Sequence, residues 1–247
     1  MQVTLVAHYG RKPPALAAFV RRLHNQLRSS LGLAFQPYDI HQVHATIVGL
    51  EGCHASEGIR NTRSGLSMNL PGVVDFLRGK EFAPIEVRIG GFHASGRYSF
   101  RSRDMHPHLR SFSIQGERAV AIGWPVEDEH HPDSLDRLRR SFQRFGVRHK
   151  WHTAADVVDN DCFLVLGRID RTASAADIEA AAESVRADLA TDSQTTMAIS
   201  RDTIAFVGYV DSALPLESSR TFSLDEPDLA VKLESLYTDC DSTTDRS

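Results

Sequence analysis

Residues 43–50 read Val-His-Ala-Thr-Ile-Val-Gly-Leu, and this stretch decides the fold. Its apolar and β-branched residues indicate a strand. Alternate strand residues point to opposite faces, so His44 and Thr46 share one face and Ala45 and Ile47 the other. An imidazole can exchange a proton near neutral pH, and a hydroxyl can donate to a phosphoryl oxygen. The pair suits phosphoester chemistry; the alternative is a hydrogen-bonded strand histidine beside a threonine that merely favours a strand.

The elements on either side of this stretch follow from hydrophobic periodicity and from Gly and Pro breaks. Further strands are predicted over 3–9, 85–89, 98–100, 111–115, 119–124, 162–169, 203–210 and 220–224, and residues 51–71 are predicted to be a loop. Helices are predicted over 14–30, 72–77, 133–145, 174–189 and 229–237.

The element order repeats, because a helix precedes a short strand in each half of the chain. Helix 14–30 precedes strand 43–50, and helix 133–145 precedes strand 162–169. Antiparallel strands with helices beside them make an α+β fold. We therefore expect two antiparallel sheets related by a pseudo-twofold, with helices on the outer faces and a central cleft. A single bilobal domain is expected over 1–225, followed by an acidic helix and a frayed tail over 226–247.

Charge and composition exclude several classes of protein. The 28 basic and 32 acidic residues give a net charge of −4, and seven of the acids lie in 225–247. The rest of the chain has no strong basic field, which argues against duplex DNA as a partner. No apolar run reaches the ~20 residues that span a membrane, and no signal peptide is evident at the N-terminus. The three cysteines are widely spaced and odd in number, which predicts reduced thiols and a cytoplasmic protein.

The HxT motif at 44–46 and the element order resemble the 2H phosphoesterase superfamily, whose fold is LigT-like or 2′-5′ RNA ligase-like. The resemblance spans about residues 3–215. It implies two HxT motifs that face each other across a cleft, with one histidine as base, the other as acid, and both hydroxyls on the phosphate. It also implies no metal and no cofactor. The second motif departs from the pattern, because Phe163 stands at the histidine position and Val165 at the hydroxyl position.

Two histidines before the second strand are candidates for the missing group. His149 and His152 lie in a basic stretch that can fold back into the cleft, and the alternative is a solvated loop. The neighbouring Asp159-Asn160-Asp161 is interpreted as an Asx-turn that leads into the strand, in preference to a metal site.

A basic segment over 97–110 is the candidate substrate-binding region. Arg101, Arg103 and Arg110 can hold a phosphate through guanidinium forks, and Tyr98 can stack on a base. The alternative is a solvated hairpin loop. His106 and His108 flank a proline, which is a weak pattern for a metal site.

Taken with the resemblance, these residues predict hydrolysis of a 2′,3′-cyclic phosphate or a related RNA-end or nucleotide phosphodiester. Catalysis would use His44 and Thr46 together with His149 or His152. The first alternative is a weak or inactive module that binds a phosphorylated nucleotide or an RNA end. The second is a protein-interaction domain in which His44 is structural.

Overall fold

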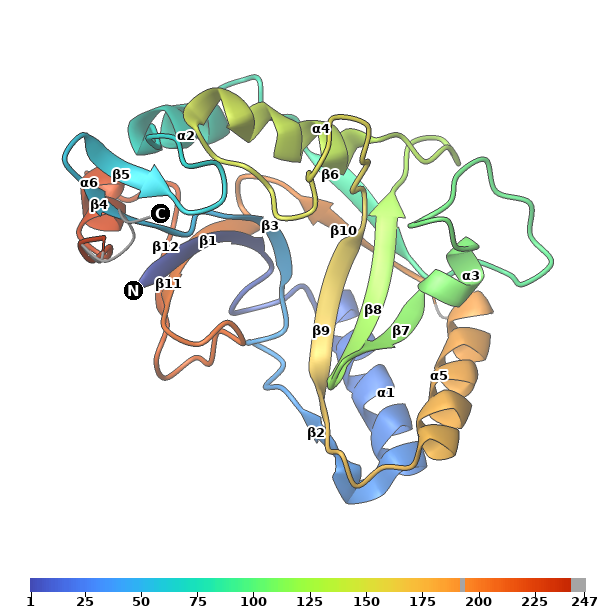
Figure 1. Ribbon diagram of the computed structural model, residues 1–247. Coiled ribbons are helices and arrows are strands. Elements are labelled where there is room, and N and C mark those ends of the chain that lie inside the picture. Colours follow the sequence, from blue (N-terminus) through green and yellow to red (C-terminus); the bar gives the residue numbers. More distant parts are fainter. Residues whose placement is uncertain (192–193, 241–247) are drawn as a thin grey trace.

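The computed structural model describes residues 1–191 and 194–240, and it has an α+β fold around one large antiparallel sheet (Figure 1). The α+β class predicted from the sequence is confirmed. A small second sheet is formed by β4 (Gly52–Ala55) and β5 (Gly58–Asn61). Residues 51–71 were predicted to be a loop, and that prediction is wrong at this hairpin.

The large sheet consists of two halves of four strands each. The first half runs in the order β3 (Ala45–Gly49), β1 (Gln2–Ala7), β11 (Ile204–Tyr209) and β12 (Arg220–Phe222). The second runs in the order β9 (Cys162–Ile169), β8 (Arg118–Pro125), β6 (Ile85–Ile89) and β10 (Thr195–Ile199). Two short strands lie beside this path, β2 (Phe35–Pro37) on β9 and β7 (Phe112–Gln115) on β8. The predicted strands 3–9, 43–50, 162–169 and 203–210 therefore each have a neighbour on both sides in the sheet.

The two halves meet at one residue pair. Ala45 of β3 pairs with Leu164 of β9, and the two strands share no other ladder pair among the described residues. The expected two sheets are thus joined edge to edge into one sheet at this pair. On either side of the pair, β3 and β9 diverge.

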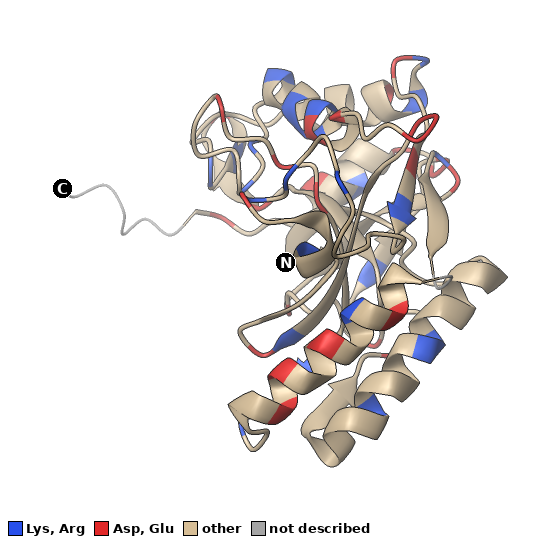
Figure 2. Cartoon of the chain, turned by 90° about the vertical axis from the view of Figure 1, so that its right-hand side faces the viewer, with Lys and Arg blue, Asp and Glu red and all other residues tan. Residues whose placement is uncertain are grey.

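Helices cover the sheet on its apolar side. Helix α1 (Pro14–Leu31) forms because Leu16, Phe19, Val20, Leu23 and Leu27 make one buried stripe, and Pro14 occupies the helix start. It packs beside α5 (Ala175–Ala190), as Figure 1 shows, and it contacts β9 and β10 of the second half. Figure 2 marks basic residues along α1 and mainly acidic ones along α5, and the side chains of Arg22 and Asp188 form an ion pair at 3.3 Å.

The remaining helices lie toward the first half of the sheet. They are α2 (Leu70–Arg78), α4 (Ser134–Ser141) with its 3₁₀ extension Phe142–Phe145, and α6 (Leu229–Glu234). Helix α4 precedes β9 in the chain but contacts β3, just as α1 precedes β3 but contacts β9. Each of these two helices therefore covers the opposite half of the sheet. A short helix, α3 (Pro107–Arg110), and a 3₁₀ turn, Gly32–Ala34, complete the elements.

The predicted strand at 98–100 is absent, because its aromatic residues pack in a cluster instead of pairing in the sheet. Tyr98 and Phe100 lie with their ring centroids 5.3 Å and 6.1 Å from that of Phe92. Phe92 in turn packs edge-on against the buried Trp124, at 4.8 Å.

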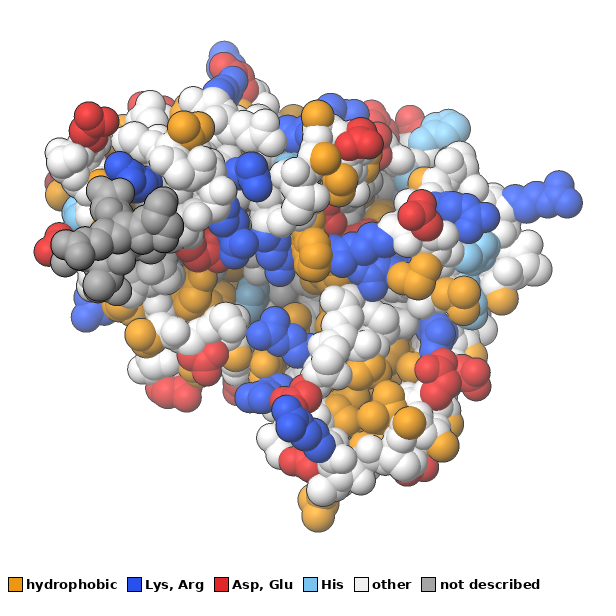
Figure 3. All heavy atoms as spheres, in the orientation of Figure 1, with side chains coloured by type: hydrophobic (Ala, Val, Ile, Leu, Met, Phe, Trp, Pro, Cys, Tyr) orange, Lys and Arg blue, Asp and Glu red, His pale blue; other side chains and the backbone are white. Residues whose placement is uncertain are grey.

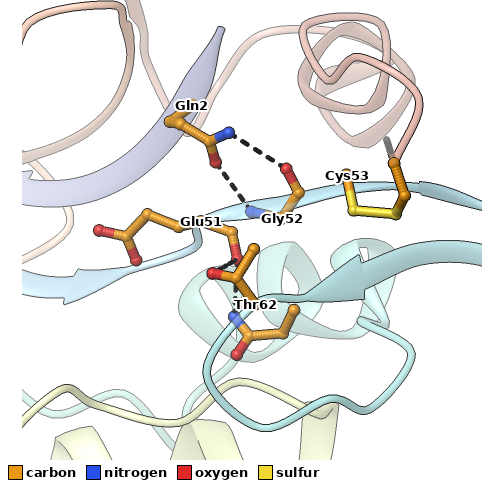
Figure 4. Close-up of a disulfide and its surroundings, with 7 residues drawn as sticks. Gln2, Glu51, Gly52, Cys53 and Thr62 are labelled. Carbon is orange, nitrogen blue, oxygen red and sulfur yellow. Dashed lines mark hydrogen bonds between the residues drawn. A yellow bond between two sulfur atoms is a disulfide. The ribbon is translucent and has the colours of Figure 1, made fainter. Parts of the chain in front are cut away.

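A disulfide joins Cys53 of β4 to Cys240, so the prediction of reduced thiols is wrong for this pair (Figure 4). The segment before Cys240 is fixed as well, since the amide of His54 donates to the carbonyl of Thr238 and that of Cys240 to the carbonyl of His54. Gln2 holds β4 at Gly52, because its side-chain Nε2 donates to the Gly52 carbonyl and its Oε1 accepts from the Gly52 amide. The predicted frayed tail is therefore ordered as far as Cys240, and 241–247 lie outside the described residues.

The expected cytoplasmic location depended on unpaired thiols. Disulfides persist mainly in oxidising surroundings, so this bond removes the ground for that expectation. No helix in the described part of the chain is long and apolar enough to cross a membrane. The third cysteine, Cys162, is a buried free thiol whose pKa is raised to about 12 by burial.

We expect Cys240→Ser to lower the free energy of unfolding by about 2–4 kcal/mol, because the disulfide restricts the unfolded chain over a separation of 187 residues. Denaturant unfolding with and without reductant measures this. Reduced wild type should match the variant, and the variant should not respond to reductant. Equal stability of oxidised and reduced wild type would contradict the prediction.

Candidate functional site

A cavity of about 260 Å³ opens where the two halves of the sheet meet. His44 and Thr46 line it from the first half, and Phe163 and Val165 line it from the second. Their neighbours Ala45, Ile47 and Leu164 face the other way into the core. The two faces predicted from strand alternation around His44 are therefore present, and the polar face borders the cavity.

The pairing of Ala45 with Leu164 defines a local twofold axis perpendicular to the sheet. Rotation about this axis exchanges position 44 with 163 and position 46 with 165. It also exchanges 47 with 166, and each of these residues is the extra one in a β-bulge, Ile47 against β1 and Leu166 against β8. Phe163 therefore occupies the position in β9 that corresponds to His44 in β3, and Val165 occupies the position that corresponds to Thr46.

The ring of His44 is held by one short hydrogen bond. Its Nδ1 lies 2.6 Å from the carbonyl oxygen of Gln42, which can only accept, so Nδ1 carries the proton and Nε2 is the unprotonated nitrogen. Burial, and to a smaller extent the charge of Lys12, lower the pKa of His44 to about 4. His44 is therefore a neutral imidazole at pH 7, with Nε2 ready to accept a proton.

Basic side chains surround the cavity. Arg63, Arg118, Arg139 and Lys150 line it, against one carboxylate, Glu51. Figure 3 shows Lys and Arg side chains gathered in a band across this face of the molecule. Such a set of cations attracts anions, and guanidinium forks match phosphate geometry.

The single carboxylate of the cavity wall is already paired. Glu51 accepts from Arg63 Nε at 3.3 Å and from Tyr209 Oη at 3.1 Å. Burial first, and then this carboxylate, raise the pKa of Tyr209, which stays protonated. The charge that remains toward the cavity is therefore positive.

The two histidines proposed as the second catalytic group lie in different places. His149 lines the cavity, and His152 does not; it is buried, with Nε2 at 2.9 Å from Asp136 Oδ1. Burial, followed by the charge of Arg139, strongly lowers the pKa of His149. Its Nδ1 lies 3.4 Å from Asp159 Oδ2. His149 is thus neutral at pH 7 and poorly suited to donate a proton.

The four predicted substrate-binding residues do not line the cavity. Arg101 is exposed and donates to the carbonyl of Asp104, and Tyr98 accepts from the amide of His93. Arg103 stacks on Trp151, with its guanidinium carbon 4.0 Å from the ring centroid. Trp151 lines the cavity, so Arg103 lies directly behind that wall.

Arg110 is fully engaged with a buried carboxylate. Its Nη2 donates to Asp161 Oδ2 at 3.1 Å, and the side chain is 4% exposed. Asp161 also accepts from Ser102 and from the indole of Trp124. The interpretation of Asp159-Asn160-Asp161 as a local turn missed these contacts, because the partners lie 37 to 59 residues away in sequence.

The cations that do line the cavity were missed by sequence reasoning. Arg118 begins β8 after a tight turn, and Arg63 lies in the stretch taken to be a loop. Arg139 lies in the predicted helix 133–145, and it is 1% exposed. The only sequence signal was the number of arginines in 133–145, which does not single out one of them.

Comparison with known proteins gives likenesses in structure alone. No family model and no curated protein matches the sequence. TT0787 of Thermus thermophilus matches with a TM-score of 0.42 and 11% identity, over 91% of this chain and 96% of that chain. Escherichia coli LigT in apo form matches with a TM-score of 0.39 and 11% identity, over 90% and 92%.

A second structure of Escherichia coli LigT, complexed with 3′-AMP, matches with a TM-score of 0.36 and 10% identity, over 90% of this chain and 92% of that chain.

Proposed function

We propose that the cavity binds the phosphate of a nucleotide or RNA end, and that it hydrolyses a 2′,3′-cyclic phosphodiester slowly. The observation that supports this most is a neutral imidazole beside a hydroxyl, His44 and Thr46, in a cavity lined by four cations. The hydroxyl of Thr46 and the guanidinium of Arg118 hold the phosphoryl oxygens in this proposal.

His44 acts as the general base. Its Nε2 takes a proton from water, the water oxygen bonds to phosphorus, and the bond from phosphorus to one ribose oxygen breaks. That ribose oxygen needs a proton in turn. His149 is a neutral imidazole and therefore a poor acid, and Phe163 has no acidic proton. In this proposal the proton therefore comes from solvent. We therefore expect slow turnover.

The size of the cavity limits how much of the ligand it encloses. Its volume of about 260 Å³ lies below the ~300–1,000 Å³ of pockets that enclose a drug-sized ligand. A phosphate with its ribose is a better match than a longer chain. The remainder of an RNA strand would then lie outside, along the basic band of Figure 3.

A second candidate function is binding without hydrolysis. It is favoured by Phe163 and Val165, which occupy the positions related by the local twofold to His44 and Thr46. Neither side chain can transfer a proton or donate to phosphate. The arginines of the cavity, by contrast, disfavour a purely protein-binding role for this face.

The test of phosphate binding is the salt dependence of affinity for 3′-AMP in wild type and Arg118→Ala. We expect the variant to bind at least tenfold more weakly and with a smaller salt slope, because one charge–phosphate contact is lost. Arg171→Ala is the matched control, since Arg171 is 91% exposed, pairs with Glu117 and lies outside the cavity. Equal affinity of wild type and Arg118→Ala would contradict the proposed site.

The test of hydrolysis is release of a nucleoside monophosphate from a 2′,3′-cyclic nucleotide by wild-type protein. Release that depends on His44 supports the enzyme. Binding without any release supports the second candidate.

A further inference from the structure

Arg139 uses all five of its N–H donors on oxygen atoms of the protein. Nε donates to the carbonyl of Ile47 at 3.0 Å and Nη2 to that of Thr46 at 3.1 Å. Nη1 donates to both the carbonyl and the carboxylate of Asp159, each at 2.8 Å, and Nη2 also donates to the carbonyl of Asp161 at 3.0 Å. A guanidinium has five N–H groups in a fixed plane. No donor of Arg139 therefore remains for a ligand.

These bonds lie where β3 and β9 diverge. The ladder between the strands has the single pair Ala45 and Leu164, so the carbonyls that follow Ala45 have no partner on β9. The bulge at Ile47 inserts one extra residue against β1. A bulge changes the local direction of the backbone groups, and here two successive carbonyls, those of Thr46 and Ile47, reach the same guanidinium.

The equivalent carbonyl in the other half accepts from two uncharged donors. The carbonyl of Leu166, the bulge residue of β9, accepts from His24 Nε2 of α1 at 2.8 Å and from the amide of Tyr38. Burial lowers the pKa of His24, so this donor is a neutral imidazole with one bond. The half that carries His44 and Thr46 is held by the charged Arg139, which makes five hydrogen bonds. The half that carries Phe163 and Val165 is held by the neutral His24, which makes one.

We propose that Arg139 is a positioning residue for phosphate binding, which fixes the backbone of Thr46 against the start of β9 and so places the Thr46 hydroxyl in the cavity. This inference rests on the proposed function. Arg139 borders the cavity without a free donor, so its effect reaches the ligand through Thr46. The Asp159 carboxylate, itself 3% exposed, orients the guanidinium from the far side.

The experiment is a double-mutant cycle between Arg139→Lys and Thr46→Val, measured as affinity for 3′-AMP. Lysine keeps the charge but has one nitrogen and cannot reach the carbonyls of both strands. We expect each single variant to bind about tenfold more weakly. In the Thr46→Val background, Arg139→Lys should weaken the affinity for 3′-AMP by less than a further twofold. An equal loss in both backgrounds would overturn the proposal, because Arg139 would then act independently of Thr46.

Two further variants separate positioning from folding. Arg137→Lys is the matched control on the same helix, since Arg137 lies away from the cavity, and it should bind as wild type does. Asp159→Asn leaves Arg139 in place but removes its ionic partner, and it serves in the same cycle if Arg139→Lys does not fold. Its loss in affinity must likewise disappear with Thr46→Val.

A measurement without ligand keeps this proposal distinct from the proposed function. NMR order parameters for the amides of Thr46 and Ile47 should fall in Arg139→Lys, or in Asp159→Asn, while those of the β1–β11 pair stay at wild-type values. Unchanged order at Thr46 would overturn the positioning role whether or not 3′-AMP binds. One outcome is that wild type binds no phosphate ligand while the order parameters of Thr46 and Ile47 still fall in the variants. In that case the proposed function fails and the positioning of Thr46 by Arg139 stands.

Discussion

His44→Ala should lower the rate of 2′,3′-cyclic nucleotide hydrolysis by about 10²–10⁴-fold, the usual contribution of a positioned base. The affinity for 3′-AMP should change little, because Thr46 and the cations that line the cavity remain. Initial rates and equilibrium binding measure the two effects separately. A loss of binding equal to the loss of rate would show that His44 only holds the ligand.

The matched control for this substitution is His41→Ala. His41 is exposed, lies three residues away and contacts the carbonyl of Gly10 through Nδ1, outside the cavity. We expect its rate to equal that of wild type. Robust hydrolysis by His44→Ala would refute both the catalytic and the binding interpretation of the site.

The pH dependence of the wild-type rate follows from the lowered pKa of His44. Above a pKa of about 4 the imidazole is neutral and can accept a proton; below it, the ring is protonated and cannot. The rate should therefore rise as the pH increases through about 4 and stay level toward pH 7. A rise centred near 6.5 would show that the catalytic base has the pKa of an ordinary exposed histidine, which contradicts the lowered pKa of His44.

The strand with His44 could be predicted because alternation of faces is a local property. Residues 44 and 46 share a face whatever the rest of the chain does. Hydrophobic periodicity, which is equally local, predicted the helix over 14–30. These features depend on residues that are close in sequence.

The role of Arg139 could not be predicted, because its burial depends on oxygens far away in the chain. The helix pattern places it next to Leu138, at the edge of the buried stripe, where a long side chain can turn outward or inward. It turns inward because carbonyls at Thr46 and Ile47, 93 and 92 residues away, lack partners on β9. The disulfide between Cys53 and Cys240 has the same origin, since only the folded chain brings those positions together.

The arginines of 97–110 show how composition misleads about a binding site. Four arginines in one segment suggest an anion site, but Arg110 and Arg103 are paired with Asp161 and Asp159. The carboxylates lie some fifty residues further along the chain and meet the arginines only in the fold. The cations that line the cavity, Arg63, Arg118, Arg139 and Lys150, come from separate parts of the chain, so no single run of charge identifies the set.

The local twofold around Ala45 and Leu164 leads to the last prediction, a gain of activity. Phe163 and Val165 line the cavity at the positions related to His44 and Thr46. The double substitution Phe163→His and Val165→Thr should therefore place a second imidazole and a second hydroxyl toward the phosphate. Since no protonated imidazole faces His44 among the described residues of the wild type, a donor at 163 supplies the proton that the leaving ribose oxygen needs.

We expect this double variant to hydrolyse a 2′,3′-cyclic nucleotide about 10²-fold faster than wild type, the lower end of the range for a positioned acid. The guanidinium carbons of Arg103 and Arg110 each lie 5.4 Å from the centroid of the present Phe163 ring, and their charges disfavour an imidazolium there. The rate should fall again at higher pH as the new histidine loses its proton. The profile should thus become bell-shaped, with its descending limb below pH 6.5.

The matched control is Phe163→Gln with Val165→Thr, which gives the same wall a polar group that does not titrate. If only polarity and hydration of the wall limit the wild type, both double variants should be equally fast. If a proton donor is what the wild type lacks, only the histidine variant gains, and adding His44→Ala to it abolishes the gain, because base and acid act on the same phosphate. A histidine variant no faster than its glutamine counterpart would show that position 163 does not face the leaving oxygen.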